Sequence, residues 1–230
     1  MRYLLFSIFA LHLLGAGAQA VQVINEPMDM IVYLVNLKNT GYADVDGSPY
    51  AEEQFRPATI ENETKTRFIR LNTADEVVEV KEEGKVMQLR LRENLHLQFT
   101  NGPKAEMIVK MHPDGEGRSK LMVFEKMKSV EDHTLYLKER KKFIPKKAKE
   151  AFQESAKARF IDLPDTYYIT DFKSNSPNLL ELPRKKKAFM AFFGTHKNAV
   201  DTYIKKEKLD YKNTEDLVKI LTFFFENRAS

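Results

Sequence analysis

The chain has 230 residues, of which 43% are hydrophobic and 30% are charged, and it contains no cysteine. This composition is typical of a globular domain and excludes an intrinsically disordered chain, while the lack of cysteine excludes disulfides, thiol catalysis and a cysteine-anchored lipoprotein. With 37 basic and 33 acidic residues, the formal net charge of +4 is too even to indicate a polyanion partner.

Residues 1–20 have the organisation of a secretory signal peptide. Arg2 supplies a positive charge, residues 3–14 form an apolar segment, and Ala18-Gln19-Ala20 provides small residues for cleavage. The apolar segment is too short for a membrane-spanning helix. We therefore expect cleavage before Val21 and export to the periplasm or the cell exterior, with no transmembrane span in the mature chain.

Residues 21–182 are expected to form a β-rich body. Runs rich in β-branched and aromatic residues recur there and are separated by turn residues, as in antiparallel sheets. Outside the central stretch described next, strands are predicted at Met30–Leu37, Thr66–Leu71, Val77–Val80, Lys120–Lys126, Thr134–Lys138, Thr166–Phe172 and Leu179–Leu182.

The clearest strand pattern lies between Val86 and Met111, where apolar and polar residues alternate. Side chains alternate between the faces of a strand, so the pattern predicts one buried and one exposed face. We expect Arg92–Asn94 to be the loop of a hairpin and Asn101-Gly102 to form the next turn. Gln88, Arg90 and Gln98 belong to the exposed face; the buried face comprises Met87, Leu89, Leu91, Leu95, Leu97, Phe99, Met107, Val109 and Met111.

Residues 183–230 are predicted to form a helical segment packed on the β-rich body. A first helix begins at Pro183 or Arg184 and ends at Gly194, because glycine readily adopts the left-handed conformation that follows a helix. Thr195 is the expected N-cap of a second helix.

The third predicted helix carries an apolar stripe that needs a partner surface. Asn213 and Asp216 resemble a capping box at the start of this helix. Within the β-rich body, a short helix is also predicted near residues 146–155. The expected fold class is therefore α+β: an antiparallel meander of about eight or more strands, curled or sandwich-like, followed by about three short helices. The stripe, at i, i+3, i+4 and i+7, consists of Leu217, Ile220, Leu221 and Phe224.

The chain lacks the local motifs of common catalytic sites, such as Gly-x-Ser-x-Gly and phosphate-binding glycine loops. Residues 44–48 begin like a calcium loop, but Pro49 replaces its turn glycine and Phe55 its glutamate. We therefore predict no catalytic, cofactor-binding or metal-binding residues and expect no cofactor. A metal-ligand spacing is also missing among the histidines of the mature chain, which are His96, His112, His133 and His196.

Two basic runs are the candidates for a partner surface. Lysine next to phenylalanine suits anionic lipid headgroups, lipopolysaccharide or nucleic acid. Acidic residues are interspersed with these runs and arginine is scarce in them, which favours the interpretation that the lysines form solvated faces. No nucleic-acid partner is expected. The two runs comprise Lys141, Lys142, Lys146, Lys147, Lys149, Arg184, Lys185, Lys186 and Lys187.

Aromatic residues cluster at Tyr167-Tyr168, Phe192-Phe193 and Phe223–Phe225. Burial between sheet and helices is the favoured interpretation, because packed helices usually hide such rings. The alternative is that some of them line a ligand groove.

Short motifs are spread over most of residues 47–226. They are Gly47–Tyr50 with Phe55, Arg70–Asn72, Asp75–Glu79, Pro164–Tyr168, Lys185–Lys187, and Tyr203 followed by Lys208-Leu209 and Asp216-Leu217. Together they resemble a family of uncharacterised exported proteins of Bacteroidota-type bacteria. The resemblance implies a β-rich body, a helical C-terminal end and an envelope or secreted location, and it transfers no functional residue.

The functional hypothesis is a non-enzymatic exported protein of a bacterial envelope or the extracellular space. Its role would be binding or structural support, and the sequence does not indicate the partner. The alternative is a hydrolase or another enzyme whose site is assembled from residues distant in the sequence.

Overall fold

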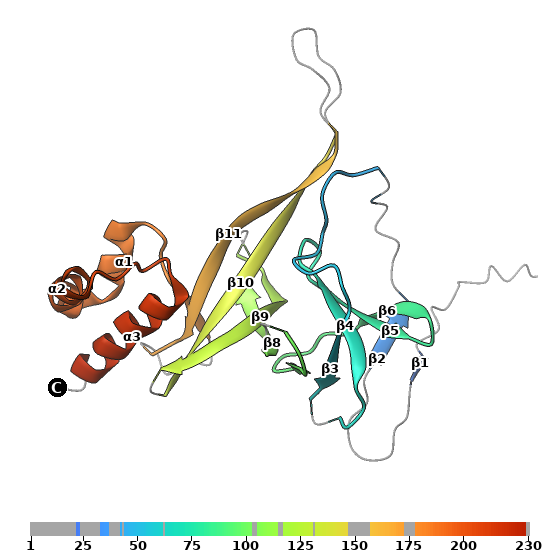
Figure 1. Ribbon diagram of the computed structural model, residues 1–230, viewed down its shortest axis with the longest axis horizontal. Coiled ribbons are helices and arrows are strands. Elements are labelled where there is room, and N and C mark those ends of the chain that lie inside the picture. The colour runs from blue at the N-terminus through green and yellow to red at the C-terminus, as the bar shows by residue number, and fades with distance from the viewer. Residues whose placement is uncertain are drawn as a thin grey trace, which may run out of the picture.

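The protein combines one antiparallel sheet with a helical C-terminal segment (Figure 1). The computed structural model describes residues 42, 44–61, 63–102, 105–114, 117–130, 132–146, 157–172 and 178–228, and the backbone of residues 22–23 and 33–36. Strands precede helices along the chain, which confirms the α+β class. None of the described helices is long and apolar enough to cross a membrane.

Neighbouring strands of the sheet are antiparallel, in the order β1-β2-β6-β5-β4-β3-β7-β8-β9-β10-β11-β12. Thus β3–β6 form one meander and β7–β12 another, and the two meet where β3 pairs with β7. The strands are β1 (Gln22–Val23), β2 (Tyr33–Asn36), β3 (Arg56–Ile60), β4 (Arg67–Asn72), β5 (Val77–Glu82), β6 (Lys85–Leu89), β7 (His96–Phe99), β8 (Glu106–Pro113), β9 (Ser119–Val130), β10 (His133–Ile144), β11 (Arg159–Thr170) and β12 (Leu179–Glu181).

The predicted hairpin around Arg92–Asn94 is wrong. β6 pairs with β2 and β5, whereas β7 pairs with β3 and β8, so this loop crosses from one side of the first meander to the other. Backbone hydrogen bonds hold the end of the loop to β8, from Asn94 N–H to the Val109 carbonyl at 2.7 Å and from Val109 N–H to the Leu95 carbonyl at 2.9 Å. Alternation identifies the face of each residue but contains no information on which strand lies next to it.

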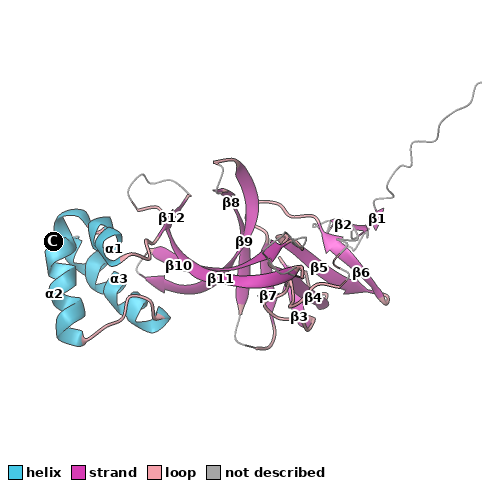
Figure 2. Cartoon of the chain, turned by 90° about the horizontal axis from the view of Figure 1, so that it is seen from above, coloured by secondary structure: helices cyan, strands magenta, loops and turns pink. Residues whose placement is uncertain are grey.

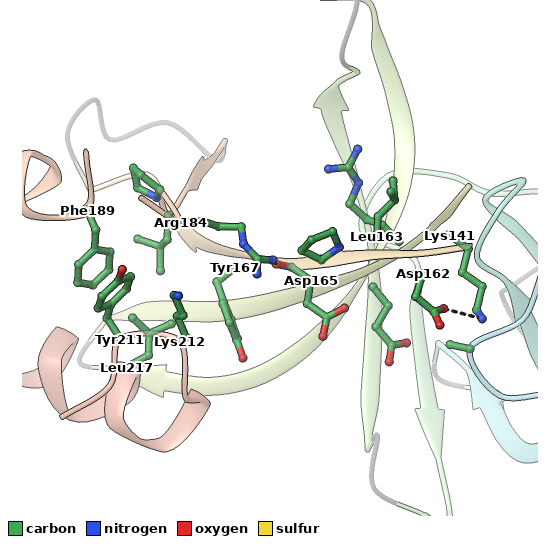
Figure 3. Close-up of a pocket in the computed structure, with 16 residues that line it drawn as sticks. Lys141, Asp162, Leu163, Asp165, Tyr167, Arg184, Phe189, Tyr211, Lys212 and Leu217 are labelled. Carbon is green, nitrogen blue, oxygen red and sulfur yellow. Dashed lines mark hydrogen bonds and ion pairs between the residues drawn. The ribbon is translucent and has the colours of Figure 1, made fainter. Parts of the chain in front are cut away.

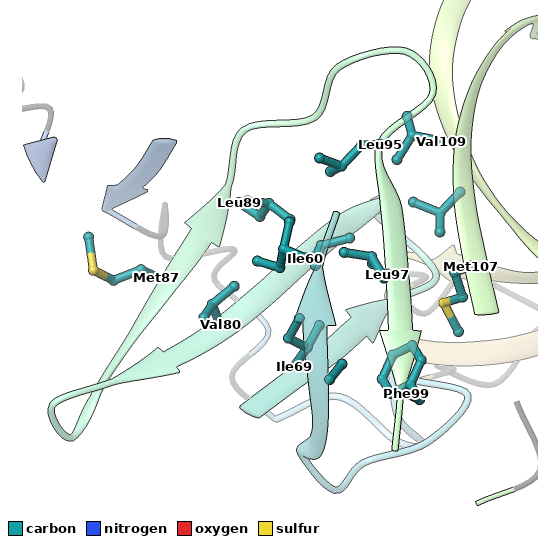
Figure 4. Packing of buried hydrophobic residues seen from close by; sticks show 13 residues of the cluster. Ile60, Ile69, Val80, Met87, Leu89, Leu95, Leu97, Phe99, Met107 and Val109 are labelled. Atoms are coloured by element: carbon teal, nitrogen blue, oxygen red, sulfur yellow. The ribbon is translucent and has the colours of Figure 1, made fainter. Parts of the chain in front are cut away.

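A first hydrophobic cluster is made of residues from each of the strands β3 to β9 and contains most of the predicted buried face (Figure 4). Leu89, Leu97 and Val109 are at most 1% exposed, whereas Arg90 and Gln98 are exposed and Gln88 is half-buried. Met111 is an exception, because it is 40% exposed. β7 pairs with β8 only as far as Ile108, so β8 extends beyond the cluster at Met111.

A second hydrophobic cluster joins the helices to the sheet. Its helical residues come from α1 (Lys186–Phe192), α2 (Lys197–Glu207) and α3 (Thr214–Arg228). The whole predicted stripe of α3 is buried there, together with Val130, Leu135, Ile169, Phe172 and Leu182 of the strands and the turns that follow them. An isolated helix of this length is marginal in water, so α3 depends on this packing.

The helix ends agree only in part with the predicted caps. Asn213 Oδ1 accepts hydrogen bonds from the backbone N–H groups of Glu215 and Asp216, at 3.0 and 3.2 Å, as an N-cap does. Asp216 bonds to the backbone N–H of Asp210, so the capping box is not reciprocal. Thr195 is not an N-cap, because a 3₁₀ turn from Gly194 to His196 leads directly into α2.

β10 and β11 form the longest strand pairing of the sheet and connect the two ends of the molecule (Figure 2). Their pairing starts at Leu135 and Ile169, next to the helices, and runs to Ile144 and Arg159. A register shift between Lys138 and Arg140 interrupts it. Of the predicted helix near residues 146–155, only Lys146 is described, and the rest lies outside the described residues.

Candidate functional site

A pocket of about 560 Å³ lies where the β10–β11 strand pair meets the helical segment (Figure 3). Its residues come from β10, β11, the turn after β12, α1, the segment before α3 and α3 itself. The site is therefore assembled from residues that are far apart in the sequence.

Aromatic and aliphatic side chains form one end of the pocket. The rings of Phe189 and Tyr211 are stacked, with centroids 4.7 Å apart and planes inclined by 22°. Leu182 and Leu217 are buried beside them. This end is anchored in the second hydrophobic cluster, so its shape is set by the packing of α1 and α3.

Tyr167 connects the strand to the start of α3. Its hydroxyl oxygen lies 2.6 Å from Oγ1 of Thr214, the first residue of α3. The side chain lines the pocket midway between its two ends (Figure 3). Because this hydrogen bond joins β11 to α3, it holds the two walls of the pocket together.

Two basic side chains lie near the aromatic end. Lys212 is exposed, its Nζ is 5.9 Å from the centroid of the Tyr211 ring, and among the described residues no carboxylate forms an ion pair with it. Arg184 donates a hydrogen bond to the carbonyl oxygen of Asp165. This bond fixes the guanidinium against β11, beside the pocket.

The opposite end of the pocket carries charged side chains of both signs, including Arg140 and Lys141. Asp162 contacts Lys141 at 2.7 Å, and the Asp162 side chain is 82% exposed while that of Lys141 is 16% exposed. Glu139 and Asp165 line the same end. The pocket thus has an apolar wall towards the helices and charged side chains of both signs towards the β-rich body (Figure 3).

The motifs between Gly47 and Glu79 form one polar network on the β-rich body. The Arg70 guanidinium stacks between the rings of Tyr50 and Phe55, at 3.7 and 4.3 Å from their centroids, and donates to the buried Glu79 carboxylate. Burial, and then the hydrogen bond to Glu79, raise the pKa of Tyr50 to about 12. The network holds the segment before β3 in place, and this segment contributes Ala51 to the pocket.

A buried ion pair between Lys138 and Glu76 joins the second meander to the first. Lys138 Nζ lies 2.5 Å from a Glu76 carboxylate oxygen and 3.2 Å from the Val123 carbonyl oxygen. Burial lowers the pKa of Lys138, and Glu76 opposes that shift. The contact places the β4–β5 turn against β9 and β10, so its role is structural.

The four histidines within the described residues lie in four separate surroundings. His96 contacts Glu106 at 2.7 Å, and His196 lies 5.7 Å from the Phe224 ring, between centroids. Burial lowers the pKa of His112, which packs on Tyr168, and of His133, which packs on Phe225. Within the described ranges, no three metal-binding side chains come together.

The structure brings one residue of each predicted basic run, Lys141 and Arg184, to the lining of the same pocket. Lys141 and Lys142 belong to β10, Lys146 is exposed after it, and Lys147 and Lys149 lie outside the described residues. The run from Arg184 to Lys187 is fully exposed at the start of α1.

Sequence reasoning missed most of the pocket. Tyr167 was a candidate groove residue, but its neighbour Tyr168 lies in a different cluster with Phe124 and Tyr136. Phe189, Tyr211 and Lys212 carried no signal, because each is an ordinary residue in its own element. Only the α3 stripe indicated that a surface must meet this part of the chain.

Comparisons with family models, with curated protein sequences and with solved structures find no match for this chain.

Proposed function

We propose that the protein is an exported binding protein of a bacterial envelope or its exterior, and that its ligand occupies the pocket between β11 and the helices. The observation that carries this proposal is the pocket itself, with Lys212 and Arg184 beside its apolar wall. A volume of about 560 Å³ lies within the range of small-molecule sites, roughly 300–1,000 Å³. An apolar wall with a few convergent polar groups is the usual composition of such sites.

The polarity of the pocket indicates the class of ligand. Phe189, Tyr211 and Leu182 offer a surface for an aromatic or aliphatic body. Lys212 and Arg184 flank this surface, and hydrogen bonds to charged groups are among the stronger polar contacts. The ligand is therefore an amphipathic anion, with its charged group beside Lys212 and Arg184.

The carboxylates of the pocket support binding rather than hydrolysis. A glycosidase needs one carboxyl group kept protonated by apolar surroundings, opposite a second carboxylate. Asp162 is 82% exposed and paired with Lys141, and Asp165 is exposed. These two solvated groups lack the surroundings of a general acid, and only Glu139, which is half-buried, is less solvated.

Titration with anilinonaphthalene sulfonate, an aromatic anion whose fluorescence rises in apolar sites, tests the proposal. We expect saturable binding, and binding weaker by roughly ten- to a hundredfold in Lys212→Glu, because a charge-assisted contact of about 1.5–3 kcal/mol is replaced by repulsion. The matched control is Lys128→Glu, an exposed lysine of β9 that does not line the pocket. Equal weakening in both variants, or no saturable binding, would contradict the proposal.

Export has its own test. Signal-peptide cleavage after Ala20 would give a mature N-terminus at Val21. N-terminal sequencing of the protein recovered from the envelope or the medium measures this directly. Recovery of the chain there with Met1 intact would refute the cleavage site.

A further inference from the structure

Positive charge is concentrated in the segment from Arg184 to Lys208. It contains eight basic and two acidic residues, a net charge of +6. The chain from Val21 onwards has 36 basic and 33 acidic residues, or +3, so its other residues together carry −3. The protein is therefore strongly dipolar, although its overall charge is modest.

We call this segment, which comprises α1, the 3₁₀ turn and α2, the basic tip. α1 and α2 lie at the end of the molecule farthest from β3–β6 (Figures 1 and 2). All eight basic residues of the tip are exposed: Arg184, Lys185, Lys186, Lys187, Lys197, Lys205, Lys206 and Lys208.

Few of these charges are neutralised within the protein. Lys205 contacts Asp201 at 2.6 Å and Lys206 lies 3.7 Å from Glu207, which uses both acidic residues of the tip. Across the described ranges, no ion pair involves the remaining lysines of the tip, which are Lys185, Lys186, Lys187, Lys197 and Lys208.

We propose that the basic tip binds the protein to a surface of anionic lipid headgroups. Near such a surface each lysine or arginine contributes about 1 kcal/mol, so several lysines together give measurable binding. Seven of the eight basic residues are lysines, whose compact charges suit a diffuse array of anions better than bidentate recognition of single phosphates.

The aromatic residues of the tip argue against nucleic acid as the partner. Binding of single strands relies on exposed rings on which bases stack. Phe189 and Phe193 are buried, the half-buried Phe192 packs edge to face against Phe172 and Phe193, and Tyr203 is stacked face to face on Phe223, with centroids 4.1 Å apart. The tip therefore offers the positive charge that a headgroup surface attracts, without the exposed rings on which bases would stack.

Vesicle co-sedimentation of the mature chain tests this inference. The wild type is compared with a tip variant in which Lys185, Lys186 and Lys187 are all changed to glutamate. Glutamate is favourable in the first turn of a helix, so α1 should still form. The control changes three exposed lysines of the β-rich body to glutamate, Lys81, Lys85 and Lys128, and so alters the net charge equally. Neither variant alters a pocket residue, so the result is independent of ligand binding.

We expect the wild type to sediment with vesicles of phosphatidylcholine containing about one third phosphatidylglycerol, and to be released when salt rises from about 0.1 to about 1 M. The tip variant should bind about a hundredfold more weakly, and the body variant should bind like the wild type. The inference fails if the wild type does not sediment or if both variants lose binding equally. Tighter binding to single-stranded DNA than to the vesicles would also overturn it.

Discussion

At the scale of single residues, the β-rich body depends on charged side chains that are buried in pairs. Arg67 is 2% exposed and lies between Glu63 and Glu82, at 3.1 and 2.9 Å. Glu79 is 1% exposed and bonds to Arg70. In the sequence Glu82 is one of many acidic residues at a strand end, where a solvated role is expected. The ion-pair partners of Glu82, Lys65 and Arg67, are set by the register between strands, which cannot be predicted from the residue itself.

The Glu76–Lys138 pair predicts a specific loss of stability. Glu76→Gln keeps the size of the side chain but leaves the buried Lys138 ammonium without its counter-charge. We expect a loss of about 3–5 kcal/mol in the free energy of unfolding. Adding Lys138→Met should restore most of it, because the unpaired charge is removed with its partner. Urea denaturation of the wild type and the two variants measures this, and a loss below about 1 kcal/mol in Glu76→Gln alone would show that the pair is unimportant.

The ion pairs of Glu82 predict that the free energy of unfolding depends on pH in the acidic range. Burial raises the pKa of Glu82, but hydrogen bonds and attraction from Lys65 and Arg67 outweigh it, so the pKa lies below its ordinary 4.5. Ionised Glu82 therefore stabilises the fold above pH 4.5, and this contribution is lost as the pH falls through the lower, folded-state pKa.

The measurement is chemical denaturation along a pH series below neutrality. Glu82→Gln should lower stability at neutral pH and reduce the loss on acidification, compared with the exposed neighbour Glu83→Gln. Parallel curves for the two variants would contradict the assignment.

At the scale of secondary structure elements, alternation and helical periodicity predicted faces but not neighbours. The residues of β6, β7 and β8 that were predicted to be buried are buried up to Val109, and the α3 stripe is buried as expected. Ile108, which the alternation places on the opposite face of β8, is also buried, in a separate cluster with Phe124 and Tyr136. The hairpin between β6 and β7 was wrong, because the chain passes to the far side of β3 before it pairs again. Such a crossing depends on long-range packing, which a local pattern does not contain.

Leu97 and Gln98 of β7 test the assigned faces. Leu97→Ala should cost about 2–5 kcal/mol of unfolding free energy, because it opens a cavity in the first hydrophobic cluster. Gln98→Ala should cost less than about 0.5 kcal/mol, since the side chain is exposed. Equal losses in chemical denaturation would mean that the faces are reversed.

At the scale of the whole molecule, the long strands β10 and β11 join the β-rich body to the helices, and the pocket lies at this junction. The need of α3 for a partner surface could be predicted from its stripe. The pocket could not be predicted, because its walls extend from Ala51 to Leu217 and meet only after the second cluster has formed.

Backbone amide chemical shifts, recorded while the mature chain is titrated with anilinonaphthalene sulfonate, test the proposed site most directly. The account predicts the largest changes on both walls of the pocket, in residues 163–167 of β11 and in residues 211–217 at the start of α3. Shifts confined to exposed apolar side chains elsewhere, such as Phe68, which is 52% exposed, or Met111, would contradict it.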